Sequence, residues 1–290
     1  MAMNRVAQAT VALGLLAVSL APGCGRTARL SAEEIVARNA AARGGRDGWR
    51  KVETMVWKGH IESAHARVPS MPFQLEQKRP NKTRLEVYAL GEMSVRAFDG
   101  VHGWALHPAR GRPALEPFTL GELKFAQGGH GVDGPLQDHA ARGNAVALEG
   151  VDEIGGRRAY HLTLRLAQGG SEDVWVDTET YLEARHDRMA DGKGGAPRRV
   201  SVTYGDYRAF EGLKIPFLIT TLGGPGETPD RMQIETVALN TPLDDSRFEP
   251  PAAARPRDRV RPGYFPRARA PTAPSTVPTA SSGGGGSSPQ

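Results

Sequence analysis

The sequence predicts an α+β protein in which one curved antiparallel sheet of about eleven strands carries helices on its concave face. Short β-prone segments alternate apolar and polar residues, and this period places the two residue classes on opposite faces of a sheet. Pairs typical of tight turns separate these segments, among them Asp99-Gly100, Gly169-Gly170 and Gly205-Asp206. Helices packed against such a sheet leave a crevice lined by its apolar side chains.

The folded part opens with a helix predicted over 32–43. Ser31 and Glu34 form a capping box ahead of this alanine-rich stretch, and Gly44 can adopt the left-handed conformation that ends it. Strands are then predicted at 55–62, 73–77, 84–88, 94–98, 103–107, 161–166, 173–176, 181–184, 199–204, 216–220 and 232–235. Shorter helices at 120–127 and 136–142 are predicted to interrupt the run of strands.

Composition excludes several classes of protein. Apolar residues make up 39% of the 290 residues and the mean hydropathy is −0.43, too polar for a protein that crosses a membrane many times. A single cysteine excludes an internal disulfide framework and a cysteine-based zinc cluster. The net charge of +5 lies in the segment after Pro250, which has six arginines and one aspartate. The rest of the chain therefore lacks the basic excess typical of nucleic-acid binding.

The N-terminus has the pattern of an export signal. Arg5 precedes the uncharged apolar run 11–21, which is shorter than the roughly 20 residues that a membrane-spanning helix needs. A small residue before the lone Cys24 resembles the lipobox of bacterial lipoproteins, whose cysteine is lipidated. The alternative is an ordinary cleaved signal with a chance cysteine. We expect a signal peptide at 1–23 and a lipidated tether at 24–30.

The C-terminal segment 251–290 is rich in proline, arginine, glycine and serine and has few residues to bury. This composition predicts a disordered tail. Its arginines either stay solvated or contact an anionic lipid headgroup layer or cell-wall polymer. The folded domain is accordingly predicted at 31–250.

No catalytic residue, cofactor site or metal site is predicted. The chain has no G-x-S-x-G nucleophile elbow and no HExxH motif. Residues 129–134 match G-x-G-x-x-G, but a predicted helix precedes them where a dinucleotide site needs a strand, which favours a loop. His102 and His107 are an odd number of residues apart on one strand, so their rings point to opposite faces. The sequence therefore favours a protein that is not an enzyme.

Three stretches of the domain resemble the periplasmic lipoprotein-carrier family, LolA and its outer-membrane receptor relative LolB. Residues 77–81 (QKRPN) resemble the family's K-R-P-N strand, and 98–108 (FDGVHGWALHP) resemble its D-G-x-x-x-W hairpin. Residues 243–251 (LDDSRFEPP) resemble its closing D…F-x-P-P segment, and 204–216 is similar to a broader group of LolA-like lipoproteins. The three stretches follow the family's order along the chain.

The resemblance implies an unclosed antiparallel β-barrel capped by helices, with a hydrophobic cavity for acyl chains. In the carrier, the arginine of K-R-P-N lies in the cavity and bonds to the helical lid, which implies a lid or cavity role for Arg79. A guanidinium has five N–H donors and can satisfy lid carbonyl groups. The alternative places Arg79 in solvent at a strand-end turn, since Pro80 marks a strand end.

Strand alternation supplies candidates for the cavity wall. Ten apolar residues are expected to point to the concave side: Phe73, Leu75, Leu85, Val87, Trp104, Leu106, Leu162, Leu164, Phe217 and Ile219. Such rows either fill a packed core beneath the helices or line an empty pocket. The resemblance implies that some of them line the pocket.

The favoured function is binding of acyl chains or lipidated polypeptide cargo, in lipoprotein or lipid sorting to the outer membrane. The alternative is an envelope-stress sensor or scaffold that binds a protein partner through the same fold. A lipidated Cys24 implies a membrane anchor. Gly25, in place of aspartate, lacks the common inner-membrane retention signal, so the resemblance implies the periplasmic face of the outer membrane.

Overall fold

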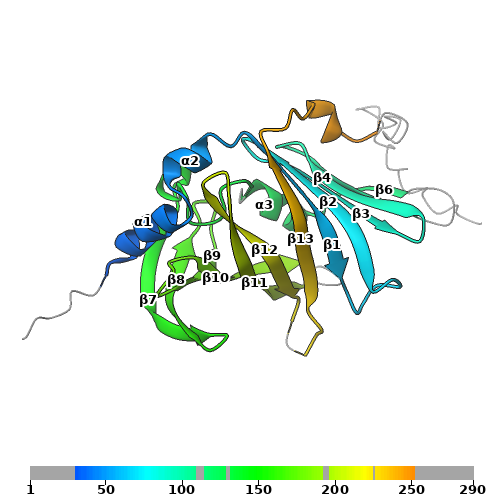
Figure 1. Cartoon of the computed structure of the whole chain (residues 1–290). Coiled ribbons are helices and arrows are strands. Elements are labelled where there is room, and N and C mark those ends of the chain that lie inside the picture. Colours follow the sequence, from blue (N-terminus) through cyan, green and yellow to red (C-terminus); the bar gives the residue numbers. More distant parts are fainter. Residues whose placement is uncertain (1–29, 109–113, 129–130, 192–195, 225, 252–290) are drawn as a thin grey trace, which may run out of the picture. The chain divides into compact units, whose positions relative to one another are not determined.

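The computed structural model describes residues 30–108, 114–128, 131–191, 196–224 and 226–251. The predicted signal peptide, Cys24 and nearly all of the predicted tail lie outside these residues, and the predictions about them stay predictions. Within the described part, the strands form one antiparallel sheet (Figure 1).

The sheet consists of two meanders that meet at its centre. From one edge inward run β6 (Ala114–Pro117), β5 (Gly103–His107), β4 (Glu92–Phe98), β3 (Lys82–Ala89), β2 (Ser70–Lys78) and β1 (Thr54–Glu62). From the centre to the other edge run β13 (Asp230–Leu239), β12 (Leu213–Leu222), β11 (Pro197–Phe210), β10 (Glu183–Asp191), β9 (Ser171–Asp177), β8 (Arg157–Arg165) and β7 (Ala145–Ile154). Edges β6 and β7 do not pair with each other, which confirms the α+β fold with an unclosed barrel.

The sheet has thirteen strands where the sequence predicts about eleven. The two additional strands are its edges, β6 and β7. An edge strand pairs on one side only and is protected by charged residues rather than by burial. Glu149, Asp152 and Glu153 interrupt the apolar pattern of β7 in this way. The alternation that predicts the inner strands is therefore weak at both edges.

Two of the three predicted helices are confirmed by the structure. Helix α1 (Ala32–Ala42) begins with the predicted capping box, in which the Glu34 amide donates to Ser31 Oγ at 3.2 Å. Helix α3 (Leu120–Gln127) also forms as predicted. The helix predicted at 136–142 is wrong, because Asp138 has a left-handed φ of 49° and leaves only the 3₁₀ turn η1 (Ala140–Arg142). A short helix that was not predicted, α2 (Arg46–Arg50), precedes β1.

The connection between β6 and β7 crosses the concave face of the sheet, because these strands lie at opposite edges. Helix α3 belongs to this connection and contacts both β5 and β10 (Figure 1). Helix α1 covers the β8–β9 region, where Ile35 and Val36 pack against Leu162 and Val174. The helices thus cover the concave face, as predicted.

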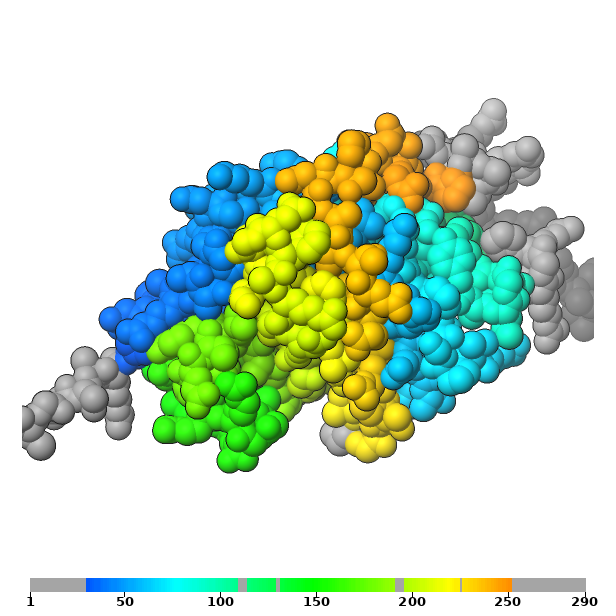
Figure 2. Space-filling model, in the orientation of Figure 1, coloured from blue at the N-terminus to red at the C-terminus, as the bar shows by residue number. Residues whose placement is uncertain are grey.

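The C-terminal segment ties the three resembling stretches together on the opposite face. Turn η3 (Asp245–Arg247) carries Arg247, whose guanidinium bonds to both carboxylate oxygens of buried Glu76 at 2.7 and 2.6 Å. The Trp104 indole donates to the Phe248 carbonyl at 2.8 Å, and Lys78 pairs with Asp245 at 2.7 Å. Figure 2 shows this orange segment packed along the cyan strands.

Gly59 provides a test of the junction between the two meanders. It lies at a register shift in the β1–β13 pairing, and a Cβ at this position would overlap the Gln233 carbonyl oxygen. We expect Gly59→Ala to lower the free energy of unfolding by about 2 kcal/mol or more, because the overlapped atoms are backbone. Urea denaturation measures the effect.

Gly150 supplies the matched control. It also lies at a register shift, in edge strand β7, but a Cβ there meets nothing within 4 Å. Gly150→Ala should therefore change stability by less than about 0.5 kcal/mol. Equal effects of the two substitutions would contradict the assigned register at the junction.

Candidate functional site

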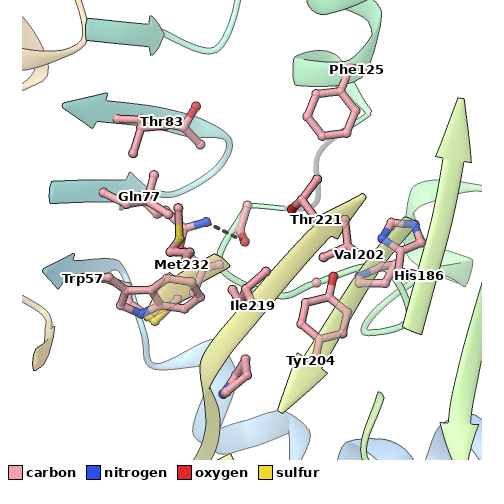
Figure 3. Close-up of a pocket in the computed structure, with 18 of the residues that line it drawn as sticks. Trp57, Gln77, Thr83, Phe125, His186, Val202, Tyr204, Ile219, Thr221 and Met232 are labelled. Atoms are coloured by element: carbon pink, nitrogen blue, oxygen red, sulfur yellow. Dashed lines mark hydrogen bonds between the residues drawn. The ribbon is translucent and has the colours of Figure 1, made fainter. Parts of the chain in front are cut away.

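A cavity of about 460 Å³ opens on the concave face of the sheet. Strands from both meanders line it, together with α3 and the loop that follows α3. Figure 3 shows the side chains from β1, β12 and β13 on one side and those from β10 and β11 on the other. The two sides differ in polarity.

The side formed by β1, β2, β3, β12 and β13 is apolar. Trp57, Leu75 and Leu85 are direct neighbours across β1, β2 and β3, so the sheet register aligns them in one row. Ile219 and Met232 pair in the same way across β12 and β13. Leu75, Leu85, Ile219 and Met232 pack against the buried core cluster but are themselves only partly buried. These strands therefore present an apolar wall to open space.

The side formed by β10 and β11 is polar. His186 and Arg188 share one face of β10, and Tyr204 and Tyr207 follow on β11. Tyr204 and Tyr207 are three residues apart, a spacing that puts side chains on opposite faces of a regular strand. Both nevertheless line the cavity, because Asp206 between them has a left-handed φ of 48°, which breaks the alternation without shifting the register with β12. The turn predicted at Gly205-Asp206 is thus wrong, because the pair lies inside one long strand, β11.

Burial raises the pKa of both tyrosines. Burial raises the pKa of Tyr204, and the neighbouring Glu183 charge acts in the same direction. Burial likewise raises the pKa of Tyr207, whose hydroxyl donates to the Glu183 carbonyl oxygen at 3.1 Å. Both phenols therefore remain neutral at physiological pH.

One end of the cavity is closed by an ion pair beneath α2. Arg43 Nη1 lies 3.3 Å from Glu183 Oε1 and donates to the Asp133 carbonyl at 2.6 Å. The same guanidinium stacks on Trp49, 4.3 Å from its ring centroid. Arg43 and Glu183 are both buried, so this end is fixed by mutual charge neutralisation.

Helix α3 covers the cavity without a buried core of its own. Arg96 on β4 pairs with Glu122, and Arg188 on β10 stacks on Phe125 with 3.7 Å to the ring centroid. Asn81 donates to the Ala126 carbonyl at 2.7 Å. Helix α3 is thus held from both arms of the sheet through polar and cation–π contacts rather than by a packed interface.

Arg79 lies beside the cavity and is not one of its lining residues. Its guanidinium donates to the carbonyl oxygens of Trp49 and Val52 at 2.9 and 2.7 Å. It also bonds to both carboxylate oxygens of Asp133, in the loop after α3, at 2.5 and 2.6 Å. The hydrogen bond to Asp133 raises the pKa of Arg79. Arg79 therefore joins the end of α2 to the loop that borders the cavity.

Three of the ten predicted wall residues line the cavity: Leu75, Leu85 and Ile219. Phe73, Val87 and Phe217 instead belong to or pack against the buried core cluster that includes Trp57. Leu162 and Leu164 are fully buried, and Leu162 packs with Ile35 of α1. These residues therefore belong to a packed core, which was the alternative to lining the pocket.

The concave orientation predicted for Trp104 and Leu106 is wrong. Leu85 pairs with Arg96, and Arg96 pairs with Ala105, so Ala105 shares the cavity face. Trp104 and Leu106 alternate with Ala105 and point to the opposite face, where they pack with Val95. The strand was predicted without its partner, and an isolated amphipathic strand does not say which side faces the helices.

Sequence reasoning missed the polar wall. His186 and Arg188 occur in a segment of alternating charges (RHDR) that has no apolar period, so no inward-facing row was recognised. Tyr204 and Tyr207 carried one signal, the Gly-Asp pair between them, which is compatible with a left-handed residue inside a strand as well as with a turn. Only pairing with β12 distinguishes the two.

The described residues do not include Cys24, so its predicted lipidation is outside what the structure describes. In that described part, no helix combines the length and apolar character that spanning a bilayer requires. The same part brings together no group of three histidine, cysteine, aspartate or glutamate side chains that could hold a metal ion.

Solved structures share the architecture just described. A LolA superfamily protein from Nitrosomonas europaea aligns with a TM-score of 0.50 at 13% identity, over 77% of this chain and 99% of that chain. The chain has a LolA-like fold. A DUF1329 family protein from Desulfovibrio piger aligns with a TM-score of 0.51 at 12% identity, over 75% of this chain and 97% of that chain. No protein-family model matches the sequence, and no curated protein matches it significantly.

Tyr204 gives a pH test of the LolA-like cavity. Its pKa in the folded state is raised above the ordinary value of about 10, so its stabilising contribution is present below pH 10 and is lost as pH rises further. Tyr204→Phe removes this ionisation. We expect its free energy of unfolding to fall less steeply than that of the unmodified chain above pH 10, by up to about 1.4 kcal/mol per pH unit.

The measurement is urea denaturation at pH 9, 10 and 11. The two proteins should have parallel pH profiles below pH 10 and diverge above it. Profiles that stay parallel to pH 11 would mean that Tyr204 ionises as readily in the folded state as in water, and would contradict its burial.

Proposed function

We propose that the chain is a non-enzymatic cell-envelope lipoprotein whose cavity binds an acyl chain, free or attached to a polypeptide. The observation that carries this proposal is the apolar wall of Trp57, Leu75, Leu85 and Met232 facing open space beneath α3. Covering such a wall with hydrocarbon gains roughly 25 cal/mol for each Å² removed from water. A cavity with one apolar wall and a few polar groups is the usual form of a small-molecule site.

The volume supports a single chain. A water-sized group occupies about 30 Å³, so the cavity admits on the order of fifteen methylene groups. The polar attachment of α3 supports entry of a ligand, because no packed core needs to be broken for the helix to move. The LolA-like fold is compatible with this use, and the lipobox-like Cys24 would hold the protein at a membrane.

The sorting role and the outer-membrane location belong to the proposal as well. They are supported by the export signal, by Gly25 after the cysteine and by the order of the LolA-like stretches. Lipoprotein cargo and free lipid both present acyl chains, and the cavity suits either.

Leu85 and Leu164 form a matched pair for testing acyl-chain binding. Leu85 lines the cavity and is partly exposed, whereas Leu164 is fully buried and does not line it. We expect Leu85→Glu to fold, because water can reach the carboxylate, and to weaken binding of a neutral fluorescent fatty alcohol at least about tenfold. Leu164→Glu should lose several kcal/mol of stability or fail to fold.

The chain carrying Cys24→Ser, purified without detergent, is suited to this measurement. Fluorescence titration gives the affinity, thermal unfolding gives the stability, and native mass spectrometry identifies any co-purified lipid. Absence of both co-purified lipid and probe binding in a folded protein would refute the proposal. A protein partner retained after delipidation would instead support the sensor or scaffold alternative.

Cys24→Ser also tests the anchor. The apolar run 11–21 is too short to hold the protein in a bilayer, so the serine variant should leave the membrane fraction. Fractionation after a high-salt wash measures this, because salt screens any attachment through the tail arginines. Retention of the serine variant in washed membranes would exclude a lipid anchor at Cys24.

A further inference from the structure

The charges that line the cavity do not balance. Five charged side chains line it: Arg43, Arg96, Arg188, Glu122 and Glu183. Arg43 pairs with Glu183 at 3.3 Å, and Arg96 pairs with Glu122. Within the part of the chain that the structure describes, Arg188 on β10 forms no ion pair or hydrogen bond. One positive charge therefore remains on the cavity wall.

The surroundings of Arg188 leave its donors available. Its guanidinium stacks on Phe125, a contact that covers one face of the cation and uses none of its five N–H groups. Burial lowers the pKa of Arg188, so the cation has lost hydration that no carboxylate fully replaces.

Glu172, the carboxylate whose charge acts on Arg188, also interacts with other basic side chains. The charge of Glu172 on β9 acts on Arg188 and, after the charges of Asp133 and Asp138, also on Arg142, another partly buried arginine. Glu172 Oε2 moreover lies 2.9 Å from His186 Nε2. Glu172 is thus shared among Arg188, Arg142 and His186, and Arg188 forms no ion pair with it among the described residues.

Arg188 lies where an amphiphile would place its headgroup. It shares a cavity-facing side of β10 with His186, and Figure 3 shows His186 and Phe125 away from Trp57 and Met232. Phe125 is 39% exposed, so this side of the cavity is close to solvent. A ligand with its polar end here extends its chain along the apolar wall.

We propose that the cavity ligand is a single-chain amphiphile with an anionic headgroup, a carboxylate or a phosphate, and that Arg188 binds this headgroup. The inference rests on the proposed acyl-chain binding and adds the charge class of the ligand. Both oxyanions match the planar donor fork of a guanidinium, which can bind either one through two parallel hydrogen bonds. A neutral headgroup cannot compensate the charge.

Three ligands of equal chain length separate headgroup from tail: dodecanol, dodecanoate and dodecyl phosphate. Each competes with a neutral fluorescent fatty alcohol for the full chain carrying Cys24→Ser. We expect one or both anions to bind at least about tenfold more tightly than dodecanol, as charge-assisted hydrogen bonds predict. Preference for dodecanoate alone or for dodecyl phosphate alone supports the proposal and identifies the headgroup.

Variants assign the preference to Arg188. Arg188→Met keeps an apolar stem beside Phe125 and should remove the anion preference while changing dodecanol affinity less than about twofold. Arg188→Lys keeps the charge without the fork and should retain part of the preference. Arg165→Met, which removes an exposed positive charge on β8, should leave all three affinities unchanged.

Two results would overturn the inference. Equal binding of dodecanol and both anions by the unsubstituted Arg188 protein would do so, even if Arg188→Met fails to fold. An equal loss for all three ligands in Arg188→Lys and Arg188→Met would make Arg188 a support for α3 only. Failure of every dodecyl ligand to bind, dodecanol included, would instead refute acyl-chain binding itself.

Discussion

The pairing of β1 with β13 is the contact on which the rest of the structure depends. Every other pair of neighbouring strands is also consecutive along the chain, so β1 and β13 alone join the two meanders into one sheet. The apolar wall crosses this junction, with Trp57 on β1 and Met232 on β13. Gly59 permits the close backbone approach at the register shift, since a side chain there would meet the opposite strand.

The strand order also determines what covers the cavity. Because β6 and β7 end at opposite edges, the chain must cross the concave face between them, and α3 lies on this path. Arginines hold the covering segments: Arg96 and Arg188 contact α3, and Arg79 contacts the end of α2 and the loop after α3. Polar attachment of this kind leaves the apolar wall uncovered, since the helix contributes few buried side chains.

An amphiphilic cavity follows from these two constraints. The first meander and the junction supply an apolar wall, while β10 and β11 supply neutral phenols, an imidazole and one arginine without an ion pair in the described part of the chain. The proposed acyl-chain binding uses the first wall, and the proposed headgroup binding uses Arg188 on the second. The LolA-like fold supplies the shape, and the side chains of β10 and β11 supply the chemical selectivity.

The sequence by itself determined the fold class, the inner strands except most of β10, helices α1 and α3 and the three LolA-like stretches, because these depend on local period, capping and turn residues. It also indicated Leu75, Leu85 and Ile219, which face inward on regular strands. Only the tertiary structure decided that Trp104 and Leu106 face outward, because orientation depends on the register with β4. It likewise decided that the left-handed Asp206 brings Tyr204 and Tyr207 onto one face and that Arg188 remains without an ion pair in the described region, since both depend on neighbours distant in the chain.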